Sequence, residues 1–232
     1  MFEQACRKIR EGVYGVIGTS VIQRNGPQVS VNATNATAFM VAPGFLITAA
    51  HFIHQENTIK KPIHENFEVI RAPEIGGSTE KAIFVAEDQV RDIALLQIHN
   101  PKNNTILKLK KDILPRGNNC GFLGFPLSVV KFLPNGNKQF NLSERFQGAY
   151  ISNYIEMPNP GRLLPYYEID TLMYAGSSGC PGFDLEGEVI GMQVATVMQN
   201  SATGSGSEHI AISLVVPSRD IIAFLEAREI LV

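Results

Sequence analysis

Short apolar runs separated by turn residues dominate the sequence and predict a fold rich in β-strands. Alternating or β-branched runs, which are typical of strands, occur at 13–23, 28–31, 38–41, 45–48, 83–86, 93–98, 120–124, 148–154, 166–170, 189–197 and 210–216. Ala42-Pro43-Gly44 lies between two of these runs and predicts a hairpin connection. The segment 128–145, with Pro134-Asn135-Gly136-Asn137 inside it, predicts a long surface loop or an added hairpin.

The two ends of the chain follow a helical period instead. Residues 2–10 have the spacing of a short amphipathic helix, and apolar residues recur at helical spacing over 217–232, where Ser218 is placed to cap the first turn. The polar segment 100–119 suits a linker, whose lysines at 108, 110 and 111 are expected to be solvated. We expect an all-β fold with a helix at each end and two domains, at 12–108 and 109–232.

Composition and charge exclude several classes of protein. The 232 residues hold 20 Lys and Arg against 22 Asp and Glu, so nothing in the charge favours nucleic acid or an anionic membrane as a partner. Three cysteines are too few for a disulfide scaffold. The most apolar stretch, 38–53, is interrupted and falls short of the roughly 18 apolar residues of a membrane helix. No secretory signal is visible, so we expect a cytoplasmic protein that binds neither nucleic acid nor membrane.

Three short motifs carry candidate catalytic chemistry, each at the end of a predicted strand. His51 ends the segment TAAH, Asp92 opens DIALL, and Ser178 lies in the small-residue turn GSSGCP. A serine hydroxyl needs a histidine to accept its proton, and a carboxylate on the other ring nitrogen orients that histidine. The order His, Asp, Ser predicts a catalytic triad, with Asp88 as the alternative carboxylate. The amides of Gly176 and Ser178 are the candidate oxyanion hole.

With these motifs, the sequence resembles the trypsin-like serine peptidases of the chymotrypsin fold, most closely the HtrA/Deg-like and bacterial glutamyl-endopeptidase-like branches. The resemblance covers residues from about 13 to 225, and its strongest segments are 36–53, 91–98, 121–126, 169–192 and 212–224. It implies two antiparallel six-stranded β-barrels with the active site in the cleft between them. It also implies a serine endopeptidase that cleaves protein or peptide substrates without a cofactor or a metal ion.

Departures from the family pattern bear on activation and specificity. Ser177 stands where families activated by N-terminal cleavage carry an acid, so that form of activation is expected to be absent. Leu172 replaces the aspartate at the pocket base of trypsin-like enzymes, and Gln193 replaces the histidine with which glutamyl endopeptidases read an acidic side chain. Cys180 stands where glycine or serine is commoner, which predicts a narrower or altered catalytic turn. We therefore expect a pocket for small or medium apolar side chains, lined by Leu172, Gln193, Val194, Ala195, Thr196 and Ser213.

The remaining histidines indicate no second site. His54 follows His51 by three residues, but no cluster of cysteines or carboxylates completes a metal site, so an exposed side chain is expected. Polar surroundings also predict that His64, His99 and His209 are exposed. Cys120, in contrast, is expected to be a small buried apolar residue.

The alternative to an enzyme is a binding or scaffold module of the same fold. Its triad would be held inactive until a partner reshapes the turn around Gly176. A regulatory protein partner is also expected for an active peptidase, because a protease among cytoplasmic proteins needs restraint.

Overall fold

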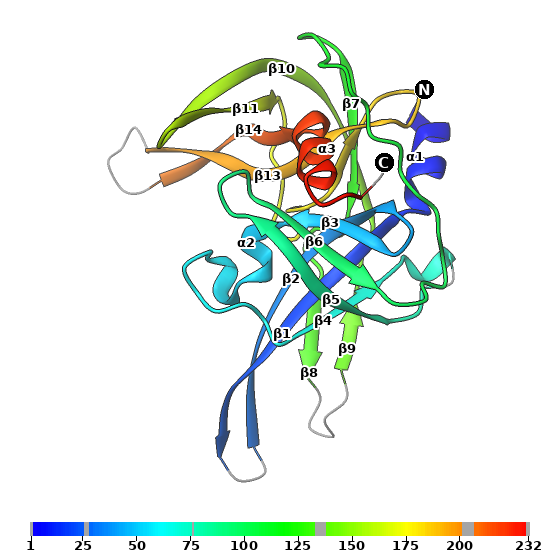
Figure 1. The fold of residues 1–232 in the computed structure, drawn as a ribbon, viewed down its shortest axis with the longest axis vertical. Coiled ribbons are helices and arrows are strands. Elements are labelled where there is room, and N and C mark those ends of the chain that lie inside the picture. Colours follow the sequence, from blue (N-terminus) through cyan, green and yellow to red (C-terminus); the bar gives the residue numbers. More distant parts are fainter. Residues whose placement is uncertain (1, 26–27, 76, 133–137, 201–206, 231–232) are drawn as a thin grey trace.

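The computed structural model describes residues 2–25, 28–75, 77–132, 138–200 and 207–230 of the 232-residue chain. Its strands close into two six-stranded barrels, the first in the lower half of Figure 1 and the second in the upper half. Helices lie near both ends of the chain. The predicted all-β fold with two antiparallel barrels and two terminal helices is therefore confirmed, while the domain boundary at 108/109 stays a prediction.

The first barrel pairs its strands in the order β1-β2-β3-β6-β5-β4. Their bounds are β1 (Val13–Asn25), β2 (Gln28–Ala42), β3 (Phe45–Ala49), β4 (Asn66–Ile70), β5 (Glu80–Asp88) and β6 (Ile93–Ile98). The predicted hairpin between β2 and β3 is confirmed. Gly44 has φ +76° there, and a Cβ atom would lie 2.7 Å from the carbonyl oxygen of Ile98, so the turn requires glycine. Strand β4 was not among the predicted runs.

The second barrel follows the order β10-β11-β14-β13-β12-β7. Its strands are β7 (Asn119–Gly124), β10 (Arg145–Asn159), β11 (Arg162–Ile169), β12 (Pro181–Phe183), β13 (Val189–Asn200) and β14 (Ser207–Pro217). The expected hairpin is confirmed as β8 (Val129–Phe132) paired with β9 (Lys138–Asn141). The turn predicted at 134–137 lies outside the described residues.

Three α-helices occur in the described part of the chain: α1 (Phe2–Arg10), α2 (Ala50–Ile53) and α3 (Ser218–Glu226). Two 3-10 turns, η1 (Gln55–Asn57) and η2 (Pro73–Ile75), border the loops of the first barrel. The prediction that Ser218 caps α3 is wrong. Pro217 is the N-cap residue, and the Ser218 hydroxyl instead donates to the carbonyl oxygen of Lys110. None of the described helices combines the length and the hydropathy needed to cross a bilayer.

A shared apolar cluster joins the two barrels. It includes Phe39 and Leu95 from the first barrel and Phe125 and Val216 from the second, all 2% exposed or less. Each barrel also has its own apolar interior. Burial of side chains from both halves in one cluster fixes the two barrels against each other, because each large aliphatic or aromatic side chain contributes about 1.5–3 kcal/mol on burial.

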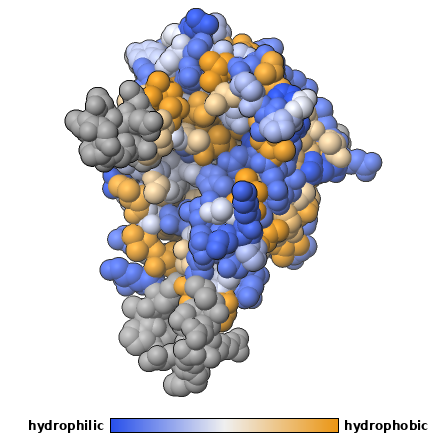
Figure 2. Space-filling model, turned by 90° about the vertical axis from the view of Figure 1, so that its left-hand side faces the viewer, coloured by the Kyte–Doolittle hydropathy of each residue, from blue (hydrophilic) through white to orange (hydrophobic). Residues whose placement is uncertain are grey.

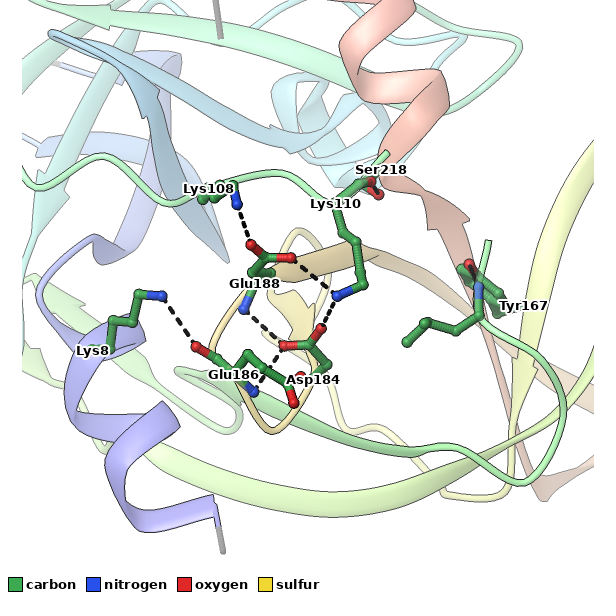
Figure 3. Close-up of polar contacts among 9 residues, drawn as sticks. Lys8, Lys108, Lys110, Tyr167, Asp184, Glu186, Glu188 and Ser218 are labelled. Atoms are coloured by element: carbon green, nitrogen blue, oxygen red, sulfur yellow. Dashed lines mark hydrogen bonds and ion pairs between the residues drawn. The ribbon is translucent and has the colours of Figure 1, made fainter. Parts of the chain in front are cut away.

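The segment between the barrels is anchored by Lys110, which corrects the expectation of a solvated side chain at this position, whereas Lys108 and Lys111 are exposed as expected. Lys110 pairs with Asp184 at 2.6 Å and with Glu188 at 3.0 Å, and Lys108 also contacts Glu188 (Figure 3). Asp184 additionally accepts hydrogen bonds from the amides of Glu186 and Glu188. The hydrogen bond to Asp184 is the main reason that the pKa of Lys110 lies well above its usual value. The linker is therefore tied to the turn between β12 and β13.

One face of the molecule shows how polarity is distributed between the barrels. In Figure 2, hydrophobic residues gather mostly over the upper half, which holds the second barrel, and hydrophilic residues dominate the centre below it. Exposed apolar side chains of the second barrel include Met157, Leu163 and Met198. The second barrel therefore carries the more apolar part of this face.

Candidate active site

His51 is positioned where β3 ends and α2 begins. Its backbone amide donates to Asp92 Oδ1 at 2.7 Å, and its Nδ1 lies 2.7 Å from Asp92 Oδ2. The amide of Ala50 donates to the carbonyl oxygen of Asp92 at 3.2 Å. Asp92 has φ +59°, in the left-handed region that aspartate tolerates better than most residues. These contacts fix both the ring of His51 and the carboxylate that faces it.

Ser178 approaches the opposite nitrogen of the same ring. His51 Nε2 lies 3.0 Å from Ser178 Oγ, within hydrogen-bonding distance. The His51 and Asp92 side chains are 23% and 19% exposed, so the contact is shielded but still open to solvent on one side. The structure thus brings the three predicted side chains from two barrels into one hydrogen-bonded line.

Two β-turns, 174–177 and 177–180, share Ser177, and Ser178 is the second residue of the latter turn. The amide of Ser177 donates to Tyr174 O at 3.0 Å, and the amide of Cys180 donates to Ser177 O at 2.8 Å. The third residue of each turn is a glycine with positive φ, Gly176 at +92° and Gly179 at +84°, whereas the second residue of each turn has negative φ. Both turns are therefore type II, which requires this conformation at the third position.

The amides of the predicted oxyanion hole are not used within the turn. In the described residues, neither the Gly176 amide nor the Ser178 amide donates to a protein acceptor. The carbonyl oxygen of Gly176 is held by the Thr37 hydroxyl at 2.9 Å, and the carbonyl oxygen of Ser178 accepts from the Thr37 amide at 2.9 Å. The carbonyl oxygens of Gly176 and Ser178 are therefore held in place, while the N–H groups of the same two residues are available to a ligand.

A cavity of about 460 Å³ opens beside Ser178. Five of the six residues predicted to line a specificity pocket are found here: Leu172, Gln193, Val194, Ala195 and Thr196. Ser213 lies behind this wall, fully buried, and donates to the carbonyl oxygen of Thr171 at 2.8 Å. Gln193 is 3% exposed, and its Oε1 has no hydrogen-bond partner among the described residues. The cavity is therefore mainly apolar with one amide in its wall.

Comparison with protein families decides the classification. Residues 36–192 match the model of the trypsin-like peptidase domain, a range that contains all three side chains of the hydrogen-bonded line. The chain belongs to the trypsin-like peptidase family.

Individual relatives support this placement and show how much of them the chain covers. It is 26% identical over 178 residues to the periplasmic serine endoprotease DegP of Salmonella typhimurium and 25% identical over 206 residues to the mitochondrial serine protease HTRA2 of Bos taurus. These alignments include 76% and 86% of this trypsin-like peptidase but 31% and 37% of the relatives, so the chain spans about a third of their length.

A solved structure has the same fold. The crystal structure of the Rv3671c protease from M. tuberculosis in its active form superimposes with a TM-score of 0.66 at 18% identity. The match covers 96% of the present chain and 82% of that chain. At this identity, the likeness shows the fold alone.

Asp88 and Cys180, which the sequence placed near the catalytic chemistry, lie outside the hydrogen-bonded line. Asp88, the alternative carboxylate, pairs with Arg91 at 2.9 Å and with Arg162 at 3.6 Å instead of with His51. Cys180 is 2% exposed and does not line the cavity beside Ser178, and burial raises the pKa of its thiol. Cys120 is fully buried, as predicted, and burial raises the pKa of its thiol to about 12. All three cysteines are free.

The prediction that His54 and His64 are exposed is wrong, because both are 4% exposed. His54 Nδ1 lies 2.6 Å from Lys61 O, and its Nε2 lies 2.9 Å from Glu87. His64 lies between hydroxyl groups of the first barrel. His99 is exposed, and the side chain of His209 lies outside the described residues. Among the residues that the structure describes, no group of three or more His, Cys, Asp or Glu side chains is arranged to hold a metal ion.

Two residues that position the site, Thr37 and Gln147, were not predicted from the sequence. Besides anchoring the catalytic turn, the Thr37 hydroxyl accepts a hydrogen bond from the amide of Phe125 at 3.0 Å. Gln147 on β10 donates its Nε2 to the carbonyl oxygen of Leu172 at 2.8 Å and so fixes one wall of the cavity beside Ser178. A polar residue inside the otherwise apolar run 36–42 was the available signal for Thr37.

Proposed function

We propose that the protein is a serine endopeptidase in which Ser178 is the nucleophile, His51 the general base and Asp92 the residue that orients His51. The observation that carries this proposal is the line Asp92–His51–Ser178, with contacts of 2.7 Å and 3.0 Å. Membership of the trypsin-like peptidase family and the relatives named as serine proteases support it.

The geometry suits acyl transfer. Ser178 Oγ attacks the scissile carbonyl carbon while His51 Nε2 takes its proton and then returns that proton to the leaving amine. Asp92 holds the imidazole in the required tautomer and stabilises the imidazolium. The amides of Gly176 and Ser178 donate to the oxyanion of the tetrahedral intermediate, and water then repeats the sequence on the acyl-enzyme. No step needs a cofactor or a metal ion.

The substrate pocket is proposed to accept small or medium apolar side chains before the scissile bond. Leu172, Val194 and Ala195 make its walls apolar, and within the described residues no charged side chain lines it. A basic or acidic side chain would lose its hydration there without gaining an ionic partner. Cleavage of a peptide library tests this assignment, and a strong preference for Lys, Arg or Glu would contradict it.

Covalent labelling of the isolated chain by a fluorophosphonate probe tests the proposed function. We expect labelling of the unaltered chain and none of Ser178→Ala, whereas Ser143→Ala, a change at an exposed serine, should label normally. Labelling that survives in Ser178→Ala would disprove the nucleophile. An unlabelled but folded unaltered chain would favour the scaffold module that awaits a partner. The positive φ of Gly176 and the free amides favour the enzyme.

Location and partners are predicted from the sequence. A cytoplasmic location and a regulatory protein partner stay predictions from the sequence, as does the absence of nucleic-acid and membrane partners. The relatives DegP and HTRA2 are named as periplasmic and mitochondrial proteins.

A further inference from the structure

A second cavity, of about 190 Å³, lies against the catalytic turn. Its walls come from β7, from the start of β10 and from the turn itself, with Phe122, Pro126 and Met173 as apolar members. Its polar lining residues are Arg145, Gln147, Tyr174 and Ser177, of which Arg145 carries the only charge among the described lining residues. Met173 and Tyr174 line both cavities, so the turn that carries Gly176 and Ser178 forms a partition between them.

Arg145 is the cationic group of this second cavity. Along β10, Gln147, Ala149 and Ile151 follow Arg145 at intervals of two, so they share one face of the strand. Ala149 and Ile151 belong to the interior cluster of the second barrel, which places Arg145 on the inward face at the open end of that barrel. Arg145 is an exposed residue, and in the described part of the chain it has no ion pair or hydrogen bond. Its guanidinium stays charged at all ordinary pH values.

Ser177 offers a second polar group at the base of this cavity. Ser177 is 3% exposed, and its hydroxyl forms no hydrogen bond with any described residue. Its backbone N–H and C=O close the two type II turns that present Gly176 and Ser178. The thiol of Cys180, also in the wall, stays neutral because burial raises its pKa. No described acidic side chain lines the cavity to neutralise Arg145.

We propose that this second cavity binds a carboxylate, which pairs with Arg145, accepts a hydrogen bond from Ser177 and thereby steadies the catalytic turn. A guanidinium matches the two oxygens of a carboxylate in a fork geometry, and the apolar walls suit the short alkyl portion of such a ligand. The cavity is small, since one water molecule takes up about 30 Å³ in the liquid, so a ligand of a few heavy atoms fills it. The carboxylate comes from a free small acid or from an acidic side chain of a bound peptide.

The position of Ser177 explains how a carboxylate bound in the second cavity affects the active site. Ser177 lies between Gly176 and Ser178, whose amides are the proposed oxyanion donors. A ligand that holds the Ser177 hydroxyl restricts rotation of the peptide group that follows Ser177, which carries the Ser178 amide. Occupied protein should therefore react faster at Ser178, a consequence that rests on the proposed function, whereas the binding itself does not.

Propionate and a blocked tripeptide with a central glutamate are the probes for the site, at constant ionic strength so that screening does not change. Binding is followed by NMR shifts of the unaltered chain, of Arg145→Gln and of Arg116→Gln, which removes the same charge at another exposed position that does not line the cavity. We expect Arg145→Gln to weaken binding at least about tenfold, because a charged hydrogen bond contributes about 1.5–3 kcal/mol, and Arg116→Gln to bind normally. Binding of propionate alone identifies a free acid as the ligand, and binding of the tripeptide but not of its glutamine counterpart identifies a peptide side chain.

Fluorophosphonate labelling provides the second readout. Propionate should accelerate labelling of the unaltered chain and of Arg116→Gln but not of Arg145→Gln, whose rate without propionate should be unchanged. Ser177→Asp places a carboxylate beside Arg145, so it should label at the accelerated rate without propionate, and the added change Arg145→Gln should remove this gain. The proposal would be overturned if neither probe binds the unaltered chain, or if Arg145→Gln binds the probes as tightly as the unaltered chain does. Propionate binding that depends on Arg145, without any fluorophosphonate labelling, would contradict the proposed function but would support the carboxylate site.

Discussion

The hydroxyl of Thr37 donates a hydrogen bond to the carbonyl oxygen of Gly176 over 2.9 Å, across a separation of 139 residues in the sequence. Thr37 belongs to β2 of the first barrel, and Gly176 belongs to the catalytic turn of the second. The same hydroxyl accepts from the amide of Phe125 at 3.0 Å, and it is fully buried. One side chain therefore sets the orientation of the turn relative to the barrel that carries His51.

Replacing Thr37 by valine should damage catalysis more than substrate binding. Thr37→Val leaves the Gly176 carbonyl and the Phe125 amide without this partner, so we expect kcat to fall at least about tenfold with little change in KM. The free energy of unfolding should fall by about 1–3 kcal/mol, the cost of unsatisfied buried polar groups. Steady-state kinetics and urea denaturation measure both effects. Thr37→Ser keeps the hydroxyl and should restore kcat, and equal losses in the two variants would argue against an orienting hydrogen bond.

The carboxylate that orients His51 can be identified by a matched pair of variants. Asp92→Asn leaves an uncharged group that cannot fix the tautomer of His51, and the same change in chymotrypsin-type enzymes lowers kcat by about 10⁴. Asp88→Asn should retain nearly full activity because Asp88 pairs with Arg91 and Arg162 and not with His51. Peptide hydrolysis by the two variants distinguishes them. A large loss in Asp88→Asn with an active Asp92→Asn would reverse the assignment.

The strands and the three motifs could be predicted because their signals are local. Strand alternation, the turn at Gly44 and the segments around His51, Asp92 and Ser178 each fit within about ten residues of sequence. The motifs also recur in a family, so their resemblance carried the two-barrel fold.

Burial of polar side chains could not be predicted in the same way, because it depends on distant partners. His54 and His64 looked exposed in their polar neighbourhoods. Glu87 lies 33 residues from His54, and Ser20 lies 44 residues from His64. Lys110 likewise finds Asp184 across 74 residues. Only the closed barrels bring such pairs together, so the folded topology and not the local pattern determines their burial.

The clamp between the linker and the second barrel should contribute measurably to stability. Lys110→Met leaves Asp184, whose side chain is 6% exposed, without its ammonium partner. Removing one partner of a buried pair costs about 3–5 kcal/mol, and we expect the lower end because Lys110 itself is 20% exposed. Lys108→Met removes an ammonium that is 72% exposed and should cost less than about 1 kcal/mol. Urea denaturation at neutral pH compares the two variants, and equal losses would show that the clamp is no stronger than a surface pair.

Acid should destabilise the protein through His64. Its ring nitrogens lie 3.1 Å from Ser20 Oγ and 2.8 Å from Thr34 Oγ1, and burial, with a smaller effect of His54, lowers its pKa from 6.5 to about 4. The unfolded chain therefore takes up a proton more readily than the folded protein. The free energy of unfolding should be highest above pH 6.5 and should fall by up to about 3 kcal/mol as the pH drops to 4, below which this loss levels off. Urea denaturation across this range should show a shallower pH dependence in His64→Gln, while His99→Gln, a change at an exposed histidine, should keep the original slope. An unchanged slope in His64→Gln would assign the acid sensitivity to other groups.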